Sequence, residues 1–136
     1  MDLGLRGKVA LVPASSSGLG RAVALVLAEE GARLAICSRD AGAIEAVAAE
    51  ARQRGAEVLA TAADVSRAAD IDRLVASTVE RFGGIDVLVT NAGGPPAGTF
   101  DRFSDDDWQA AFELTLMSVV RLIRASLPSM QARGGA

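Results

Sequence analysis

The sequence predicts an α/β domain of three layers, in which a doubly wound parallel sheet lies between helices. Two observations predict this class. Short apolar runs alternate with helical segments of about 10–15 residues, which is the pattern of successive β-α-β units. A turn of small residues joins the first apolar run to an apolar helix, and such junctions bind anions in sheets of this type. A length of 136 residues with 50% hydrophobic side chains fits one domain over residues 1–136.

The first β-α unit covers the segment up to Gly31. Lys8–Val12 is a strand because it is short, apolar and β-branched at two positions. Gly18–Glu30 is a helix, and its apolar side chains run around the whole circumference, as in a helix buried on a sheet. Gly31 is suited to the left-handed conformation in which helices commonly end.

The second and third units follow with little linker. Strand Arg33–Ser38 leads to a helix that Asp40 caps and Gly55 closes. Strand Glu57–Ala60 leads to a helix that Ser66 caps. The positions expected to face the sheet are Ile44, Val47, Ala48 and Ala51 in the first of these helices and Ile71, Leu74, Val75 and Val79 in the second, which ends at Gly83-Gly84.

The last unit begins with the strongly apolar strand Ile85–Thr90, followed by the Gly/Pro loop Gly93–Gly98. Ser104 opens the final helix with Asp107 three residues on, as in a capping box, and Pro128 limits that helix. Right-handed crossovers then give the strand order 3-2-1-4. Ligands of such sheets bind at the carboxyl ends of the strands, in the crevice between the first and fourth.

The turn Pro13–Gly20 carries the main functional signal. Its small residues leave the main chain exposed, and the following helix adds unpaired N–H groups and the positive end of its dipole. This arrangement favours binding of the diphosphate of a dinucleotide. Gly18 and Gly20 alone are also compatible with simple turn chemistry.

Three further polar positions follow the next strands, at the same edge of the predicted sheet. Arg39, directly after a neutral serine, can pair bidentately with a phosphate, or it is a solvated surface charge. Asp64 can accept a hydrogen bond from an adenine amino group, or it is a turn residue. Asn91–Gly93 can tie neighbouring strand ends together and leave room for a ligand, or form a turn alone.

Composition narrows the classes of function. A net charge of −3 disfavours a nucleic-acid partner. Without histidine and with Cys37 as the only cysteine, no metal site is expected, and Cys37 itself reads as an inert core thiol. No apolar run approaches the ~18–20 residues of a membrane span, and no signal peptide is evident, so we expect a cytoplasmic protein. Tyrosine and histidine, two common proton-transfer residues, are both missing.

Together these segments resemble the short-chain dehydrogenases/reductases, including their members of the 3-oxoacyl-acyl-carrier-protein reductase type. The resemblance rests on VALVPASSSGLGRAVALVLAEEGA, CSRD, ADV and DVLVTNAGG, at matching spacing over essentially the whole chain. It implies a Rossmann-type fold, NADP rather than NAD as cofactor, and hydride transfer between a carbonyl and a secondary alcohol. By resemblance, Ala14, Ser15, Ser16, Ser17, Gly18, Leu19 and Gly20 cover the pyrophosphate and ribose, Ser38 and Arg39 take the 2′-phosphate, Asp64 and Val65 hold the adenine, and Asn91, Ala92 and Gly93 line the nicotinamide side.

Two positions depart from the family pattern. Pro13-Ala14 stands where the family has Thr-Gly, so a backbone donor is lost and a Cβ is added where close approach is needed. Cofactor binding should therefore be weakened or slightly altered in pose. Thr115 aligns with an asparagine that supports the family's proton relay. It is the one candidate catalytic residue, or its hydroxyl bonds the preceding helical turn.

The family's chains are considerably longer, and their catalytic serine and Tyr-x-x-x-Lys pair follow a fifth strand that would begin just beyond Ala136. We therefore expect the cofactor-binding half of a reductase, truncated before the fifth strand and inactive by itself, whose intact form acts on a small carbonyl or alcohol. An apolar fourth strand at the sheet edge, or the last helix, should promote a homo-oligomer. The alternative is a non-catalytic nucleotide-binding or assembly module.

Overall fold

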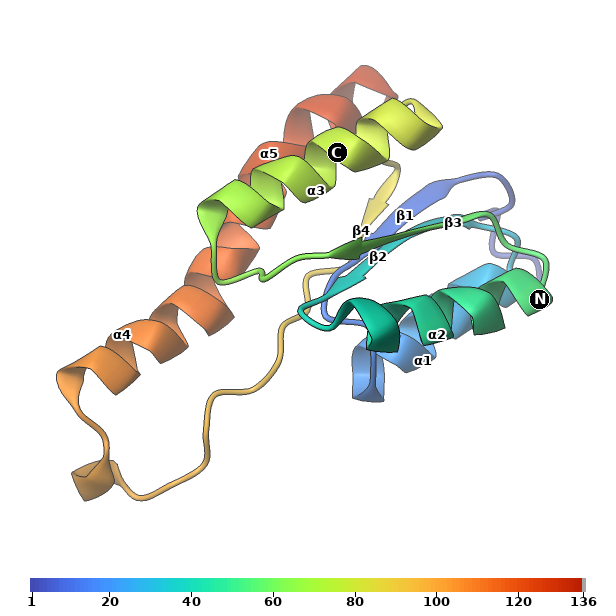
Figure 1. Cartoon of the computed structure of the whole chain (residues 1–136). Coiled ribbons are helices and arrows are strands. Elements are labelled where there is room, and N and C mark those ends of the chain that lie inside the picture. The colour runs from blue at the N-terminus through green and yellow to red at the C-terminus, as the bar shows by residue number, and fades with distance from the viewer. Residues whose placement is uncertain (136) are drawn as a thin grey trace.

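The computed structural model describes residues 1–135 and contains a four-stranded parallel sheet. The strands are β1 (Val9–Val12), β2 (Arg33–Ser38), β3 (Val58–Ala62) and β4 (Val87–Leu88). The helices are α1 (Gly18–Glu29), α2 (Ala41–Gln53), α3 (Ala68–Phe82), α4 (Asp105–Phe112) and α5 (Ser118–Ala132), with the 3-10 turn η1 (Phe100–Arg102) and the π-helical segment η2 (Glu113–Met117). The order β3-β2-β1-β4 confirms the predicted topology (Figure 1).

The sheet separates two hydrophobic cores. Helices α1 and α2 cover one face, and α3 and α5 cover the other (Figure 1). Because successive side chains of a strand point to opposite faces, β1 and β2 supply both cores. Ala10 and Ile36 pack on the α1/α2 side, whereas Leu11 and Cys37 pack on the α3/α5 side, and all four are fully buried. Continuous apolar strands are thus required by burial on both faces.

The predicted helix ends are largely confirmed. Gly31 and Gly83, with φ of +84° and +85°, take the left-handed conformation after α1 and α3. Asp40 caps α2 by accepting a backbone hydrogen bond from its first turn at 2.9 Å. Ser104 and Asp107 form a reciprocal capping box at the start of α4. These local signals depend on residues close in sequence, which is why the sequence alone identifies them.

The prediction that Ser66 caps α3 is wrong. The N-cap position is Arg67, whose side chain makes no capping bond. Ser66 instead donates both its N–H (2.9 Å) and its Oγ (2.6 Å) to Oδ1 of Asp64. As an N-cap, the hydroxyl would accept a hydrogen bond from an N–H of the first helical turn, whereas here it donates to the carboxylate two residues upstream.

Two further expectations about burial and strand length are corrected. α1 is not buried all round, because Leu19 and Val26 are 82% and 52% exposed. Only its one face, centred on Ala24 and Ala28, packs against the sheet. β4 is shorter than predicted, since among the described residues it pairs with β1 alone. β3 runs two residues further toward its carboxyl end than predicted, because its ladder to β2 continues to the end of that strand.

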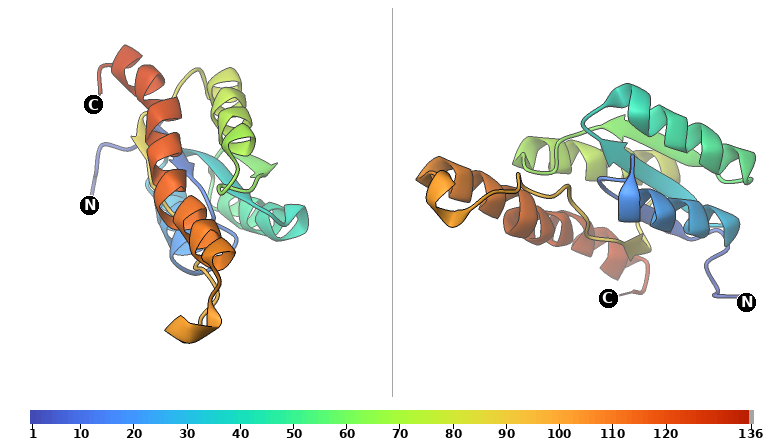
Figure 2. Two further views of the ribbon diagram at one scale, coloured as in Figure 1. Left: turned by 90° about the vertical axis from the view of Figure 1, so that its left-hand side faces the viewer. Right: turned by 90° about the horizontal axis from the view of Figure 1, so that it is seen from below.

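The last helical region differs most from the prediction of one continuous helix. The π-helical η2 interrupts it, and α4 and η1 extend beyond the sheet rather than cover it (Figure 2). Pro128 lies inside α5, which continues to Ala132. The proline therefore does not end the helix, since the turn beyond it is held to the sheet by its own contacts.

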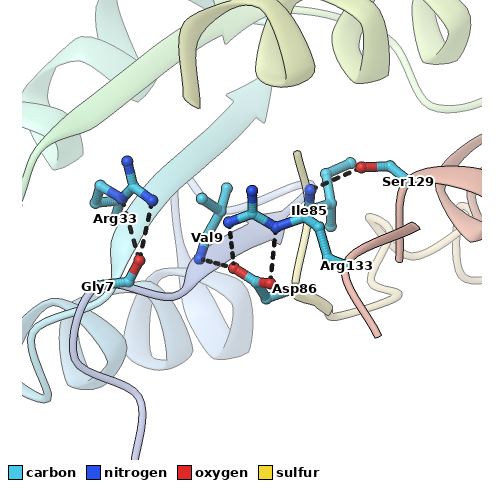
Figure 3. A network of polar contacts seen from close by, with 7 residues as sticks. All are labelled: Gly7, Val9, Arg33, Ile85, Asp86, Ser129 and Arg133. Carbon is cyan, nitrogen blue, oxygen red and sulfur yellow. Dashed lines mark hydrogen bonds and ion pairs between the residues drawn. The ribbon is translucent and has the colours of Figure 1, made fainter. Parts of the chain in front are cut away.

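Those contacts form a polar network at the amino ends of the strands (Figure 3). Asp86 accepts hydrogen bonds from the N–H of Val9 (2.8 Å) and from Nε and an Nη of Arg133 (2.9 Å each). Ser129 accepts the N–H of Ile85 at 3.0 Å. The Arg133 guanidinium lowers the pKa of Asp86 to about 2, in spite of partial burial. The end of α5 is thus bonded to the segment that leads into β4 and, through Asp86, to the start of β1.

Candidate functional site

The turn after β1 is fixed by hydrogen bonds that Ser15 donates to β2 and to β1 itself. Ser15 donates its N–H to the carbonyl of Cys37 (3.0 Å) and its Oγ to the carbonyl of Val12 (2.7 Å). Ser15 itself is fully buried. Ala14 has a φ of +51°, a left-handed conformation that costs roughly 1–2 kcal/mol for an alanine. The surrounding bonds therefore hold a strained residue at this point.

Asn91 ties the segment after β4 to the same turn, which is one of the two interpretations that the sequence allows. Its Nδ2 donates to the carbonyls of Pro13 (3.2 Å) and Ala14 (3.0 Å). A Cβ added to Gly20 would lie 2.5 Å from the Ala14 carbonyl oxygen and 2.6 Å from Nδ2 of Asn91. Only glycine fits here, so α1 can begin in close contact with the turn.

The first turn of α1 leaves its N–H groups free. Ser17 is the N-cap but makes no side-chain capping bond, and no acidic residue lies in the first turn. The helix's first hydrogen bond runs from the Arg21 N–H to the Ser17 carbonyl at 3.2 Å. Within residues 1–135, nothing accepts from the N–H groups of residues 16–20. This local geometry suits an anion.

A cleft of about 980 Å³ opens at the carboxyl ends of the strands. Of the predicted residues, Ala14, Ser16, Ser17, Ser38, Arg39, Asp64, Val65 and Gly93 line it, whereas Ser15, Gly18, Leu19, Gly20, Asn91 and Ala92 do not. The cleft also includes Asp40, Ala63, Gly94, Pro96 and Leu114, which the sequence analysis did not assign to it. Asp40, Ala63, Gly94 and Pro96 lie within three residues of a predicted cleft residue in the sequence, so they could have been included in the predicted site. Leu114 is far from the other lining residues in the sequence, and only the fold brings it to the cleft.

Beside β2, the cleft wall carries an unpaired guanidinium. Ser38 is buried and its Oγ donates to the carbonyl of Asp40 at 2.8 Å. The Asp40 carboxylate accepts a bond from Ala43 as the cap of α2, although Asp40 also borders the cleft. Arg39 is exposed and makes no ion pair within the described chain. The cleft wall therefore carries one guanidinium that forms no ion pair with the carboxylates of the described chain, Asp40 and Asp64 in the same wall included.

Beside β3, the cleft wall carries a carboxylate held in a fixed turn. Oδ1 of Asp64 accepts two hydrogen bonds from Ser66, and the Asp64 N–H donates to Oδ2 of Asp70 at 2.8 Å. That N–H lowers the pKa of Asp70, with a smaller contribution from Arg73. Val65 is buried beside it. Asp64 is thus a turn residue that also borders the cleft.

Thr115 lies outside the cleft. It is exposed in η2, and its Oγ1 donates to the carbonyl of Ala111 at 2.6 Å. Of the two interpretations of Thr115, the structure favours the one in which the hydroxyl bonds the preceding turn.

Other reactive side chains are few. Cys37 is a free, buried thiol, and burial raises its pKa to about 11, so it is held as the inert neutral form. Across residues 1–135, acidic, histidine and cysteine side chains form no group of three that could hold a metal ion. No helix in this range has the length and apolarity needed to cross a bilayer.

Residues 8–136 match the sequence profile of the short chain dehydrogenase family. The chain belongs to the short-chain dehydrogenases/reductases. Members of this oxidoreductase family share a Rossmann-type domain that binds a nicotinamide dinucleotide, and the parallel sheet and cleft described above are that domain's architecture.

Short-chain dehydrogenases with similar sequences and structures come from distant organisms. The human dehydrogenase/reductase SDR family member 4 is 36% identical over 132 residues, which cover 96% of this chain and 48% of that protein. L-Sorbose reductase from Gluconobacter frateurii, crystallised with NADPH and L-sorbose, superposes with a TM-score of 0.95 at 40% identity, over 100% of this chain and 52% of that one.

A short-chain dehydrogenase/reductase from Burkholderia phymatum in complex with NAD superposes with a TM-score of 0.91 at 33% identity, covering 97% of this chain and 47% of that one. The chain thus spans about half the length of the short-chain dehydrogenases it matches. Both forms of the nicotinamide cofactor occur among its structural neighbours.

Proposed function

We propose that this chain binds NADP(H) in the cleft and forms the cofactor-binding part of an enzyme that interconverts a small carbonyl compound and a secondary alcohol. The observation that carries the proposal is Arg39. Its guanidinium borders the cleft at the end of β2, where this fold meets the adenosine ribose, and no carboxylate neutralises it within residues 1–135. A guanidinium there attracts a 2′-phosphate.

The lining residues suit successive parts of the cofactor. The free N–H groups of Ser16 and Ser17 suit the diphosphate, Asp64 and Val65 the adenine, and Gly93 the nicotinamide side. The bound nicotinamide supplies or accepts a hydride. The residues Ser15, Gly18, Leu19, Gly20, Asn91 and Ala92 act in this proposal by shaping the turns around the cofactor.

The preference for NADP over NAD rests on charge. Enzymes that select NAD place an acidic side chain near the ribose, which would repel a 2′-phosphate. Here the residue at the end of β2 is the neutral Ser38, whose hydroxyl is bonded to a carbonyl. Asp40 is the nearest acid in sequence, and its carboxylate is engaged as a helix cap. Arg39 is therefore the dominant charge at this position.

Titration of NADPH and NADH against the chain, followed by nicotinamide fluorescence, tests the proposal. We expect tighter binding of NADPH, and Arg39→Ala should weaken NADPH about 10–100-fold while leaving NADH nearly unchanged. Arg124→Ala is the matched control, because Arg124 is exposed on α5 and does not border the cleft. Equal affinities for both cofactors in the unchanged chain would contradict the NADP preference.

The second candidate is a non-catalytic nucleotide-binding or assembly module. The sequence holds no tyrosine and a single lysine, Lys8, which precedes β1 at the edge remote from the cleft. We therefore expect cofactor binding without turnover of carbonyl or alcohol substrates by these 136 residues. Failure to bind either cofactor would favour an assembly role.

Self-association is part of the proposal. Trp108, Phe112, Leu116 and Ile123 on the α4–α5 region are 45–54% exposed, and β4 pairs with one strand among the described residues. Exposed apolar helix surface and an unpaired strand edge both favour association with a second copy. Sedimentation at micromolar concentration should show a species larger than a monomer.

A single buried cysteine is compatible with the expected cytoplasmic location.

A further inference from the structure

An acidic residue outside the cleft holds the segment that follows β3. Asp70, in the first turn of α3, accepts the N–H of Asp64 at 2.8 Å through Oδ2. Its Oδ1 lies 3.4 Å from an Nη of Arg73, and that Nη also donates to the carbonyl of Ala62 at 2.9 Å. A carboxylate and a guanidinium from one helix thus bind the main chain on both sides of residue 63. Asp70 does not itself line the cleft.

Only one of the two carboxylate oxygens of Asp64 accepts hydrogen bonds within residues 1–135. Ser66 donates two hydrogen bonds to Oδ1, at 2.9 and 2.6 Å, whereas Oδ2 has no partner within residues 1–135. Ala63 and Val65 on either side are each 5% exposed, so they anchor the segment in the core. Asp64 borders the cleft, and Oδ2 is therefore its one available acceptor.

Asp70 remains ionised in this arrangement. The N–H of Asp64 lowers its pKa, and the neighbouring Arg73 and Arg67 act in the same direction. An ionised acceptor makes a stronger bond to a backbone N–H than a neutral one. The position of Asp64 thus depends on a charged contact behind the cleft wall, in addition to the local turn with Ser66.

We propose that Asp70 is a positioning residue for adenine recognition. By holding the main chain of Asp64, it keeps Asp64 Oδ2 available to accept a hydrogen bond from the exocyclic amino group of adenine. The cleft then discriminates adenine from a base with a carbonyl oxygen at that position. This inference rests on the proposed binding of NADP(H).

The test compares NADPH with its hypoxanthine analogue, in which a carbonyl oxygen replaces the adenine amino group. We expect the unchanged chain to bind NADPH about tenfold more tightly, the value of one hydrogen bond to a charged group. Asp70→Ala should reduce this ratio to below about threefold by weakening NADPH, with the affinity for the analogue changed less than about twofold. Asp70→Asn keeps an oxygen acceptor for the Asp64 N–H and should restore most of the ratio.

Two further variants separate positioning from general stability. Asp72→Ala is the matched control, since Asp72 lies on the same helix, is exposed and makes no hydrogen bond or ion pair in the described chain; its ratio should equal that of the unchanged chain. Arg73→Ala removes an exposed partner of Asp70 and should give an intermediate ratio, which keeps the test decisive if Asp70→Ala does not fold. Thermal unfolding monitors the fold of each variant.

The outcomes are distinct. An unchanged ratio in Asp70→Ala, or in Arg73→Ala where Asp70→Ala is unfolded, overturns the inference. Equal weakening of both cofactors in Asp70→Ala also overturns it, because that is the result of a purely structural role. An unchanged chain that binds both cofactors equally well overturns the inference and leaves the proposed NADP(H) binding intact. Binding of neither cofactor overturns the proposed function and this inference together.

Discussion

The two ends of the parallel sheet use their polar groups in opposite ways. At the amino ends, Asp86 accepts three hydrogen bonds from Val9 and Arg133, so charges and amides satisfy one another (Figure 3). At the carboxyl ends, the guanidinium of Arg39 and the N–H groups of residues 16–20 have no protein acceptor in the described chain. Internally paired groups stabilise the fold, whereas unpaired groups bordering a cleft remain available to a ligand.

Backbone strain follows the same division. Ala14, the one non-glycine residue with positive φ in residues 1–135, lies at the carboxyl end. Asn91 and the buried Ser15 hold it in place through their hydrogen bonds. The amino end shows no comparable strain among its described residues. Substitutions at the two ends should therefore separate ligand binding from stability.

The largest effect is expected from Gly20→Ala, which disrupts the packing of the turns at the carboxyl ends of the strands. The new Cβ would lie 2.5 Å from the Ala14 carbonyl oxygen and 2.6 Å from Nδ2 of Asn91. Such overpacking should lower the free energy of unfolding by about 3 kcal/mol and abolish NADPH binding. Urea unfolding and cofactor titration measure both. Gly42→Ala, whose Cβ meets only an ordinary contact at 3.4 Å, is the control, and equal stability of the two variants would refute the expectation.

Arg133→Ala removes the ion pair with Asp86 at the amino ends of the strands and should lower the free energy of unfolding by about 1–2 kcal/mol. It leaves the Asp86 carboxylate, only 13% exposed, without its guanidinium partner. NADPH affinity should not change, because neither residue borders the cleft. Arg124→Ala on the same helix should leave both quantities unaltered. A loss of cofactor affinity in Arg133→Ala would show that the two ends are coupled.

The pH dependence of unfolding sharpens this result. The folded-state pKa of Asp86, about 2, lies below the ordinary 3.8, so the pair contributes stability above pH 4 and loses it as pH falls toward 2. Unfolding free energies measured between pH 5 and 2 should therefore fall more steeply in the unchanged chain than in Arg133→Ala. Parallel curves would mean that the network does not carry this stability.

Ala14→Gly should raise the unfolding free energy by about 0.5–1 kcal/mol, because glycine tolerates the φ of +51° without strain. Part of the gain is offset by the greater freedom of glycine in the unfolded chain. Ala69→Gly, in the first turn of α3, should instead lower the free energy by up to about 1 kcal/mol. Chemical denaturation of both variants checks the opposite signs. A destabilised Ala14→Gly would mean that the methyl group makes packing contacts that outweigh the strain.

The smallest effect is expected outside both ends, at Thr115. Its Oγ1 donates to a helical carbonyl at 2.6 Å while exposed to water, so Thr115→Ala should change stability by less than about 0.5 kcal/mol and leave NADPH binding unaltered. Thr78 makes the same type of bond at 2.8 Å but is fully buried, and Thr78→Ala should cost more than about 1 kcal/mol. Weaker cofactor binding in Thr115→Ala would show that this residue contributes to the cofactor site.

The sequence predicted the parts of the fold that depend on neighbouring residues. Strand order, the Asp40 and Ser104 caps and the glycine ends of helices follow from periodicity and local hydrogen bonding. It predicted the wrong cap for α3, because the Ser66 hydroxyl donates to the Asp64 carboxylate, two residues upstream, instead of accepting from the first turn of the helix. The end of the last helix was missed for a different reason: contacts of Arg133 with Asp86, 47 positions away, hold the helix beyond Pro128.

For the candidate site, the order of strands and helices was enough to predict which turns meet at the carboxyl ends of the strands, since parallel topology places these ends together. Which side chains border the cleft could not be predicted in this way, because it depends on the packed fold. The packed fold turned Ser15 and Asn91 inward to hold the main chain, brought Leu114 to the wall and set Asp70 behind Asp64. The physical reason is that strand and helix patterns are local, whereas the direction of a side chain and its partners depend on packing between distant segments.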